Sequence, residues 1–181
     1  MILYLLLVLL GLIVVLFAFP QLSPVPYFPA NKKDIDLILK ALRLRSHQVV
    51  IDLGAGDGIV IFKAAKEAME RGINTKFIAV EINPLLILIL YVRRLMSPNR
   101  ANIKIVWADM FKINLSQLSK PSNHTTIFVY ISPWLMPELF ENVRRSLKKF
   151  EVVSYFYPLP KLKDQRLIKT TKNIHAIYRY S

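Results

Sequence analysis

The sequence predicts an α/β protein built on a largely parallel sheet, and two observations carry that prediction. The first is an apolar, β-branched run at 49–51 that enters a glycine-rich turn at 52–58 and is followed by helical spacing at 59–71. The second is the repetition of the pattern, with further apolar strands at 75–80, 103–107, 125–131 and 151–157. Such a turn suits a nucleotide-type ligand, because glycines let the backbone approach it and the helix N-terminus offers unpaired N–H groups.

The N-terminal stretch Ile2–Phe19 has 18 residues without a charge, enough for about 27 Å of helix. Because no positive region precedes it and Ala18-Phe19-Pro20 is a poor cleavage site, we expect an uncleaved transmembrane helix rather than a signal peptide. Lysine and arginine follow the span and none precedes it, which predicts a single-pass membrane protein whose following domain is cytoplasmic. The expected organisation is an anchor at 1–20, a proline-rich linker at 21–31 and one domain at 32–181.

The composition excludes several kinds of chemistry. The 181 residues include no cysteine, so disulfides, thiolate metal sites and cysteine nucleophiles are excluded. The three histidines, His47, His124 and His175, have no metal-ligand spacing, so no metal site is expected and each is read as a surface or loop residue. The net charge of +13 favours an anionic partner, and the apolar N-terminus makes the anionic inner leaflet a better candidate than nucleic acid.

The linker leads into a predicted helix, Lys32–Leu44, for which Asn31 is the expected N-cap. Tyr27 lies just before this helix. It is a candidate to line an acceptor pocket, and the alternative is that it packs the linker against the domain or the lipid interface.

The glycine turn separates two ligand classes by its spacing. A dinucleotide site prefers G-x-G-x-x-G, whereas here Ile59 takes the place of the third glycine of that pattern. The pattern D-x-G-x-G-x-G resembles motif I of the class I S-adenosylmethionine (SAM) methyltransferases. The resemblance assigns the methionine end of SAM to this turn, with these expected cofactor residues: Asp52, Gly54, Ala55, Gly56, Asp57 and Gly58.

Acidic residues follow the next two strands. Glu81 ends the second strand, where a carboxylate can accept the ribose hydroxyls, and Ile82 adjoins it. Asp109 follows the third strand, where related enzymes bind the adenine amino group, and Met110 beside it is expected to wall the adenine.

Aromatic and hydroxyl side chains follow the fourth and fifth strands. Ser132 and Trp134 stand where amino-methyltransferases often carry an Asp/Asn-Pro-Pro-aromatic element, but the acid or amide is missing, and a turn-and-cap role is the alternative. Tyr157 is a further acceptor-pocket candidate. The helix body 85–92 has no polar face, so its outer side is expected to meet lipid, the anchor or substrate, unless it is simply buried.

A narrower resemblance emerges from the N-terminal span, Pro26-Tyr27-Phe28-Pro29, the glycine turn, Glu81 and Tyr155-Phe156-Tyr157-Pro158. Together they are similar to the small membrane-anchored protein-lysine methyltransferases that include the ATP synthase c-subunit and adenine nucleotide translocase enzymes. Five strands and a closing hairpin, predicted at about 163–170 and 173–180, make up a seven-stranded class I, Rossmann-like sheet. The resemblance implies a SAM-dependent methyltransferase that modifies a lysine of a membrane-embedded protein. A membrane methyltransferase acting on a lipid or quinone, and a SAM-binding protein without turnover, remain the alternatives.

Overall fold

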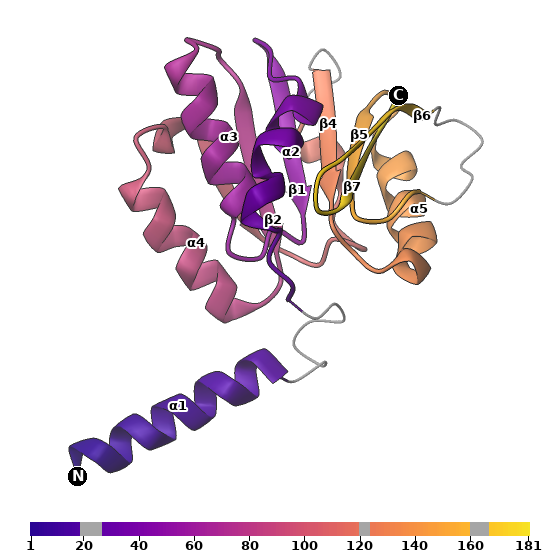
Figure 1. Ribbon diagram of the computed structural model, residues 1–181. Coiled ribbons are helices and arrows are strands. Elements are labelled where there is room, and N and C mark those ends of the chain that lie inside the picture. Colours follow the sequence, from indigo (N-terminus) through magenta and orange to yellow (C-terminus); the bar gives the residue numbers. More distant parts are fainter. Residues whose placement is uncertain (19–26, 120–123, 160–166) are drawn as a thin grey trace.

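The computed structural model describes residues 1–18, 27–119, 124–159 and 167–181 (Figure 1). A seven-stranded sheet of order β3-β2-β1-β4-β5-β7-β6 forms its centre. Of the described strands, β7 alone runs in the opposite direction to the rest. The strands are β1 (Gln48–Leu53), β2 (Lys76–Glu81), β3 (Ile103–Trp107), β4 (His124–Val129), β5 (Glu151–Tyr155), β6 (Leu167–Lys172) and β7 (Ala176–Tyr180). The predicted sheet is confirmed.

Helices cover both faces of the sheet. One face carries α2 (Ile35–Leu42), α3 (Ile59–Glu70) and α4 (Pro84–Met96), and the other carries α5 (Met136–Ser146) (Figure 1). Short 3₁₀ helices connect these elements: η1 (Lys32–Asp34), η2 (Arg100–Asn102), η3 (Leu115–Gln117) and η4 (Pro133–Leu135).

Every residue of β1 is buried because both faces of the sheet are covered. Val50 packs into the cluster beneath α2 and α3, whereas Val49 and Ile51 pack into the cluster beneath α5. This two-sided burial explains why β1 reads as a continuous apolar run rather than an alternating one.

The parallel strands all end at one edge of the sheet, and the β6–β7 turn lies at that edge too, because β7 runs antiparallel to β5. Two strands end earlier than the sequence suggests. β4 stops at Val129 and β5 at Tyr155, so Tyr130 and Tyr157 belong to the connections at this edge. The predicted helix at 32–44 is a turn of 3₁₀ helix followed by α2.

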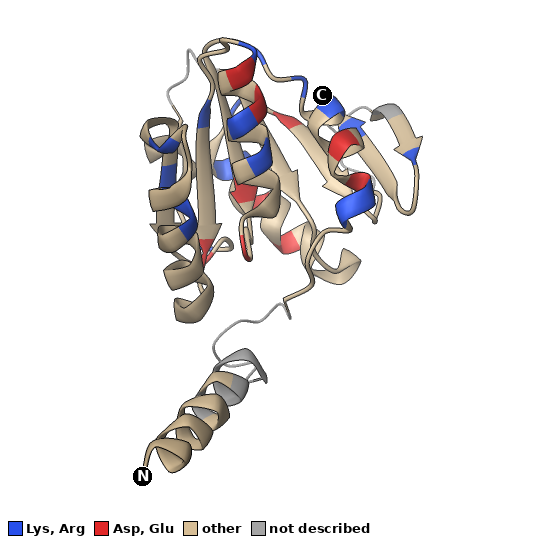
Figure 2. Cartoon of the chain, turned by 60° about the vertical axis from the view of Figure 1, so that its left-hand side comes forward, with Lys and Arg blue, Asp and Glu red and all other residues tan. Residues whose placement is uncertain are grey.

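The apolar N-terminus forms α1 (Ile2–Ala18), a helix of 17 residues that carries no charged side chain (Figure 2). Its first nine residues, Ile2–Leu10, are each more than half exposed. Among the residues that the structure describes, no helix combines the length and the apolarity needed to cross a membrane, so a transmembrane helix is not supported. Residues 19–20 of the predicted anchor and 21–26 of the predicted linker lie outside the described residues.

The helix α4 is two-sided despite its uniformly apolar body. Leu86, Ile87 and Leu90 are buried against the sheet. The other side exposes residues at positions i, i+3, i+4, i+7 and i+8, which we call the α4 apolar face: Leu88, Tyr91, Val92, Leu95 and Met96. The outer side of α4 is therefore apolar and exposed, while the partner that it meets stays a prediction.

Candidate functional site

The glycine turn after β1 adopts the conformation that its sequence requires. Gly54, Gly56 and Gly58 all have positive φ, at 84°, 57° and 76°. The N–H groups of Gly54 and Ala55 both donate to the Val80 carbonyl of β2, which draws the turn across the end of the neighbouring strand. Gly58 then serves as the N-cap of α3. A residue with a Cβ would be strained at each of the three glycines.

Glu81 holds this turn from the end of β2. Its Oε2 accepts the Gly56 N–H at 2.8 Å, and its Oε1 accepts the N–H groups of Ile82 and Asn83 at 2.8 and 2.9 Å. A carboxylate has about four acceptor positions, so three of them are committed to the backbone here. The structure thus brings together the predicted residues Gly56, Glu81 and Ile82, and it leaves Glu81 capacity for about one more donor.

Asp52 lies buried in β1 beside two other acids. Burial raises its pKa well above the ordinary value, and the nearby charges of Glu81 and Asp57 raise it further. The site therefore favours a neutral Asp52 when no cation is present. A positively charged ligand would favour the ionised carboxylate instead, and SAM carries both a sulfonium and an ammonium group.

Arg93 of α4 is a site residue that the sequence patterns do not indicate. Its guanidinium Nη1 lies 2.9 Å from Asp57 Oδ2 and donates to the Asp57 carbonyl at 2.7 Å. The other Asp57 oxygen, Oδ1, accepts the Ile59 N–H at 3.2 Å, at the first turn of α3. Arg93 and Asp57 thus tie the turn to α4. An arginine at the end of an apolar helix gives no local signal of this role.

Two side chains cover the glycines. An ideal Cβ built on Gly56 would lie 2.7 Å from Tyr27 Cε2, and one on Gly54 would lie 3.5 Å from Met110 Sδ. Tyr27, expected at an acceptor pocket, therefore lies against the predicted cofactor turn. Its pKa is raised by burial, by the charge of Asp57 and by a hydrogen bond with Asp57, although Arg93 acts in the opposite direction.

Asp109 organises the connection after β3. Its Oδ1 accepts the Phe111 N–H at 2.9 Å, and its Oδ2 forms an exposed ion pair of 3.5 Å with Lys112. Asp109 is thus a turn-capping acid that retains acceptor capacity for an amino group. Trp107 donates from Nε1 to the Ile82 carbonyl at 2.9 Å and so links the ends of β3 and β2.

The remaining acceptor candidates lie in different surroundings. Trp134 is 77% exposed in η4, and Ser132 is the N-cap residue of that helix without a side-chain capping bond. The Tyr157 ring contacts Phe156 edge-on at 4.4 Å between centroids, and its carbonyl accepts the Ser154 hydroxyl at 2.6 Å. None of these contacts by itself assigns an acceptor role.

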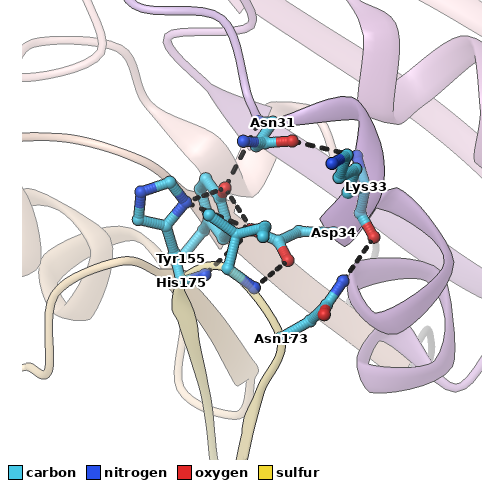
Figure 3. A network of polar contacts seen from close by, with 7 residues as sticks. Asn31, Lys33, Asp34, Tyr155, Asn173 and His175 are labelled. Carbon is cyan, nitrogen blue, oxygen red and sulfur yellow. Dashed lines mark hydrogen bonds and ion pairs between the residues drawn. The ribbon is translucent and has the colours of Figure 1, made fainter.

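A polar cluster around Asp34 joins the start of α2 to β5 and to the β6–β7 turn (Figure 3). The fully buried Asp34 carboxylate accepts the Tyr155 hydroxyl at 2.8 Å and the backbone N–H groups of Ile174 and His175 at 2.8 and 3.0 Å. His175 Nδ1 lies 3.2 Å from Asp34 Oδ2 and 2.8 Å from the Tyr155 oxygen. Burial raises the Asp34 pKa, but these hydrogen bonds outweigh burial and lower it overall.

Comparison with known protein families finds a match for the chain. The ANTKMT methyltransferase domain matches residues 52–166, which is more than half of the chain. The chain belongs to the ANTKMT methyltransferase family. The predicted resemblance and the predicted methyltransferase class are thereby confirmed.

Curated relatives carry lysine methyltransferase names. The chain is 26% identical over 167 residues to an ATP synthase c-subunit lysine N-methyltransferase of Homo sapiens, covering 91% of this chain and 65% of the relative. The Xenopus laevis protein of the same name is 26% identical over 75% of this chain and 54% of its own length. The chain thus spans about half to two thirds of these relatives. A protein-lysine N-methyltransferase of Saccharolobus islandicus is 25% identical over 86% of this chain and 92% of its own length.

Solved structures share the fold. An RNA methyltransferase from Salinibacter ruber in complex with S-adenosyl-L-homocysteine superposes with a TM-score of 0.68 at 20% identity, covering 84% of this chain and 92% of that one. A SAM-dependent methyltransferase from Geobacter sulfurreducens, also with S-adenosyl-L-homocysteine, gives 0.53 at 16% identity, covering 85% and 59%. At these identities the likeness concerns the fold alone.

The residues present fit SAM as a ligand. The glycine turn supplies backbone that bulky side chains would block, since a Cβ on Gly56 would enter the space of Tyr27. The carboxyl groups of Asp52 and Asp57 match the positive charge of the methionine end. Within the described ranges, no group of three or more histidine, cysteine or acidic side chains is arranged to hold a metal ion.

Proposed function

We propose that this chain transfers the methyl group of SAM to a lysine ε-amine of a membrane protein. The proposal rests on the glycine turn: Glu81 accepts the Gly56 N–H, Asp52 lies near Glu81, and the Tyr27 ring covers Gly56. Family membership and the lysine methyltransferase names of the relatives support the acceptor class. SAM supplies an activated methyl group, so the residues of the site mainly have to align the two reactants and exclude water.

We assign the cofactor contacts by element. Asp52, Asp57 and the turn backbone at 54–58 face the methionine end, Glu81 and Ile82 the ribose, and Asp109 and Met110 the adenine. The three strand ends from which these residues come are adjacent, in the order β3-β2-β1, as an elongated ligand crossing the edge of the sheet requires. For the acceptor side we retain Tyr27, Ser132, Trp134 and Tyr157 as candidates.

We also propose that α1 associates the enzyme with a membrane, with the catalytic domain on the cytoplasmic side. The support is physical: α1 has no charged residue and its first nine side chains are more than half exposed, which is costly in water. The test is fractionation of cells expressing the full chain, followed by a high-salt wash and an alkaline carbonate wash. We expect the washed membranes to retain the full chain but not a variant without 1–18. If the washes release both proteins into the soluble fraction alike, the proposed role of α1 is rejected.

The acceptor is tested by incubating membranes and the full chain with methyl-labelled SAM, then separating protein from an organic extract. We expect label in protein, on lysine after hydrolysis. Label confined to the organic extract would replace the lysine proposal by the lipid or quinone alternative. SAM binding without label in either fraction would indicate a binding protein without turnover. Gly56→Ala should abolish labelling, whereas Gly72→Ala, at a glycine of similar φ with no atom near its Cβ position, should preserve it.

A further inference from the structure

We propose that His175 is the group that accepts the proton of the acceptor lysine, with Asp34 and Tyr155 fixing its orientation. This inference rests on the proposed function, because a lysine side chain with an ordinary pKa of about 10.4 is almost entirely protonated near neutral pH. The ammonium has no lone pair with which to attack a methyl group, so the reaction needs the neutral amine.

The hydrogen-bond directions determine which ring nitrogen of His175 carries the hydrogen. The Tyr155 hydroxyl has one hydrogen, and it donates this hydrogen to Asp34 Oδ2. The contact of 2.8 Å between the Tyr155 oxygen and His175 Nδ1 is therefore satisfied when Nδ1 carries a hydrogen and donates. Asp34 Oδ2, 3.2 Å away, can share that hydrogen. The neutral ring then has its lone pair on Nε2, which points away from the network (Figure 3).

The surroundings hold the ring in place. The Phe156 ring lies 4.5 Å from the His175 ring between centroids, and the Tyr155 ring meets it edge-on at 5.6 Å. Phe156 has a φ of +75°, an unfavourable conformation for a residue with a side chain, and its N–H donates to the Ala176 carbonyl at 2.8 Å. Strained backbone of this kind concentrates at functional sites.

The cluster lies on the same side of the molecule as the predicted cofactor turn. The β6–β7 turn lies at the edge of the sheet where the parallel strands end, the same edge as the glycine turn. The chain that covers Gly56 with Tyr27 continues to Asn31, whose N–H donates to the Tyr155 hydroxyl at 3.2 Å. The segment from Tyr27 to Asp34 thus runs from the predicted cofactor turn to the His175 cluster.

An acid lies directly beside the His175 ring. The hydrogen bonds of the buried Asp34 lower its pKa, and its Oδ2 lies 3.2 Å from His175 Nδ1, where it helps to orient the ring. The Tyr155 phenol also contacts the ring, and Tyr130, whose pKa is raised by burial, packs edge-on against Tyr155. The Tyr155 pKa is raised by burial and by its hydrogen bond with Asp34, so its hydroxyl stays protonated and orients the ring.

Protons and electrons balance in the proposed step. His175 Nε2 takes one proton from the lysine ammonium, and the freed amine lone pair forms the N–C bond to the methyl carbon. The C–S bond breaks and its electron pair stays on sulfur. The imidazolium then returns its proton to water.

The test compares wild type with His175→Gln in methyl transfer to membrane protein across pH. We expect His175→Gln to lose about 10²-fold in rate near neutral pH and to recover as pH approaches the lysine pKa, while its SAM dissociation constant is unchanged. His124→Gln is the matched control, because His124 is exposed at the start of β4, at the opposite edge. In His175→Gly, added imidazole should restore part of the rate.

A measurement independent of activity is ¹⁵N NMR of histidine-labelled protein. The wild-type signals that disappear in His175→Gln belong to His175. In the free protein they should show a protonated Nδ1 and an unprotonated Nε2. The inference is overturned if His175→Gln keeps the wild-type rate and pH profile, or if Nε2 carries the proton. Wild type that labels no protein would instead reject the proposed acceptor, a result distinguishable from failure of the His175 inference alone.

Discussion

The carboxylate of Glu81 accepts the backbone N–H of Gly56 at 2.8 Å, so the acid expected to bind ribose also holds the expected cofactor turn in place. This contact joins the ends of β2 and β1 through a buried, charge-assisted hydrogen bond. If Glu81 binds the cofactor as proposed, we expect it to act both by direct contact and through the shape of the turn.

Replacing Glu81 by Gln tests this double role. The Gln amide has one acceptor oxygen, so at least one of the N–H groups of Gly56, Ile82 and Asn83 would lose its partner. We expect a loss of about 1–3 kcal/mol in the free energy of unfolding, together with weaker SAM binding. Urea unfolding and calorimetry measure the two effects. Glu67→Gln, at an exposed helix pair with Arg71, should change neither appreciably, and equal behaviour of the two variants would contradict the prediction.

Replacing Gly56 by Ala tests the close approach of Tyr27. The variant combines a backbone strain of about 1–2 kcal/mol with a collision between the new Cβ and the Tyr27 ring. Gly72 has a φ of +64°, and a Cβ built on it has no neighbouring heavy atom within 4 Å, so Gly72→Ala introduces the backbone strain without a collision. We therefore expect Gly72→Ala to lose stability but keep SAM affinity, and Gly56→Ala to lose both, as measured by thermal unfolding and SAM titration. SAM affinity equal to wild type in Gly56→Ala would refute the arrangement.

Replacing Asp52 by Asn tests the raised pKa. A carboxyl whose pKa is higher in the folded chain contributes stability below its unfolded pKa and loses it as pH rises through the folded value. The stability of Asp52→Asn relative to wild type should therefore increase as pH rises from about 4 towards neutral. Urea unfolding at several pH values measures this difference. In return the variant should bind SAM more weakly, because it lacks the charge that the ligand stabilises.

Replacing Arg93 by Lys tests the link between α4 and the turn. One arginine nitrogen contacts both the carboxylate and the carbonyl of Asp57, a geometry that a lysine does not reproduce with the same reach. We expect weaker SAM binding with a small change in thermal stability. Arg71→Lys, at an exposed pair of 2.8 Å with Glu67, is the matched control and should bind SAM as wild type does.

Polar substitutions on the α4 apolar face test whether this face contacts a membrane or a substrate. Leu88 and Leu95 are 60% and 67% exposed, so changing both to Gln should leave folding and SAM affinity nearly unchanged. If this face meets lipid or a membrane substrate, the membrane-bound fraction or the rate on membranes should fall, since a leucine moved from water contributes about 1.5 kcal/mol or more. Met69→Gln, an exposed apolar residue of α3, is the control. Collapse of SAM binding in the double variant would mean that the face is structural.

The residues around the predicted cofactor turn could be found from the sequence because their signals are local. A β-branched run ends directly at glycines that need positive φ, and Glu81 and Asp109 each follow a strand. The parallel order of the strands then brings these ends together without further information. The predicted strand boundaries lie within a few residues of the observed ones, and those of β3 agree at both ends.

The remaining parts of the site depend on contacts that no local pattern encodes. Asp34 reads as an ordinary acid in the first turn of a helix, and His175 as a loop histidine. Their roles appear only when antiparallel β7 carries the β6–β7 turn to the start of α2. Likewise, the apolar run of α4 conceals which side is buried, because that depends on how the helix lies on the sheet.

The hydrogen bond between the Asp34 carboxylate and the His175 N–H spans 141 residues of sequence. The expected cofactor residues, by contrast, lie within 52–110 on strands joined by short βα units. Contacts across long stretches of chain cost more loop-closure entropy, so they form late in folding. If the β6–β7 hairpin detached from the sheet, the expected cofactor residues would stay in place but His175 would be displaced. Local unfolding of this hairpin alone would therefore separate binding of the methyl donor from methyl transfer.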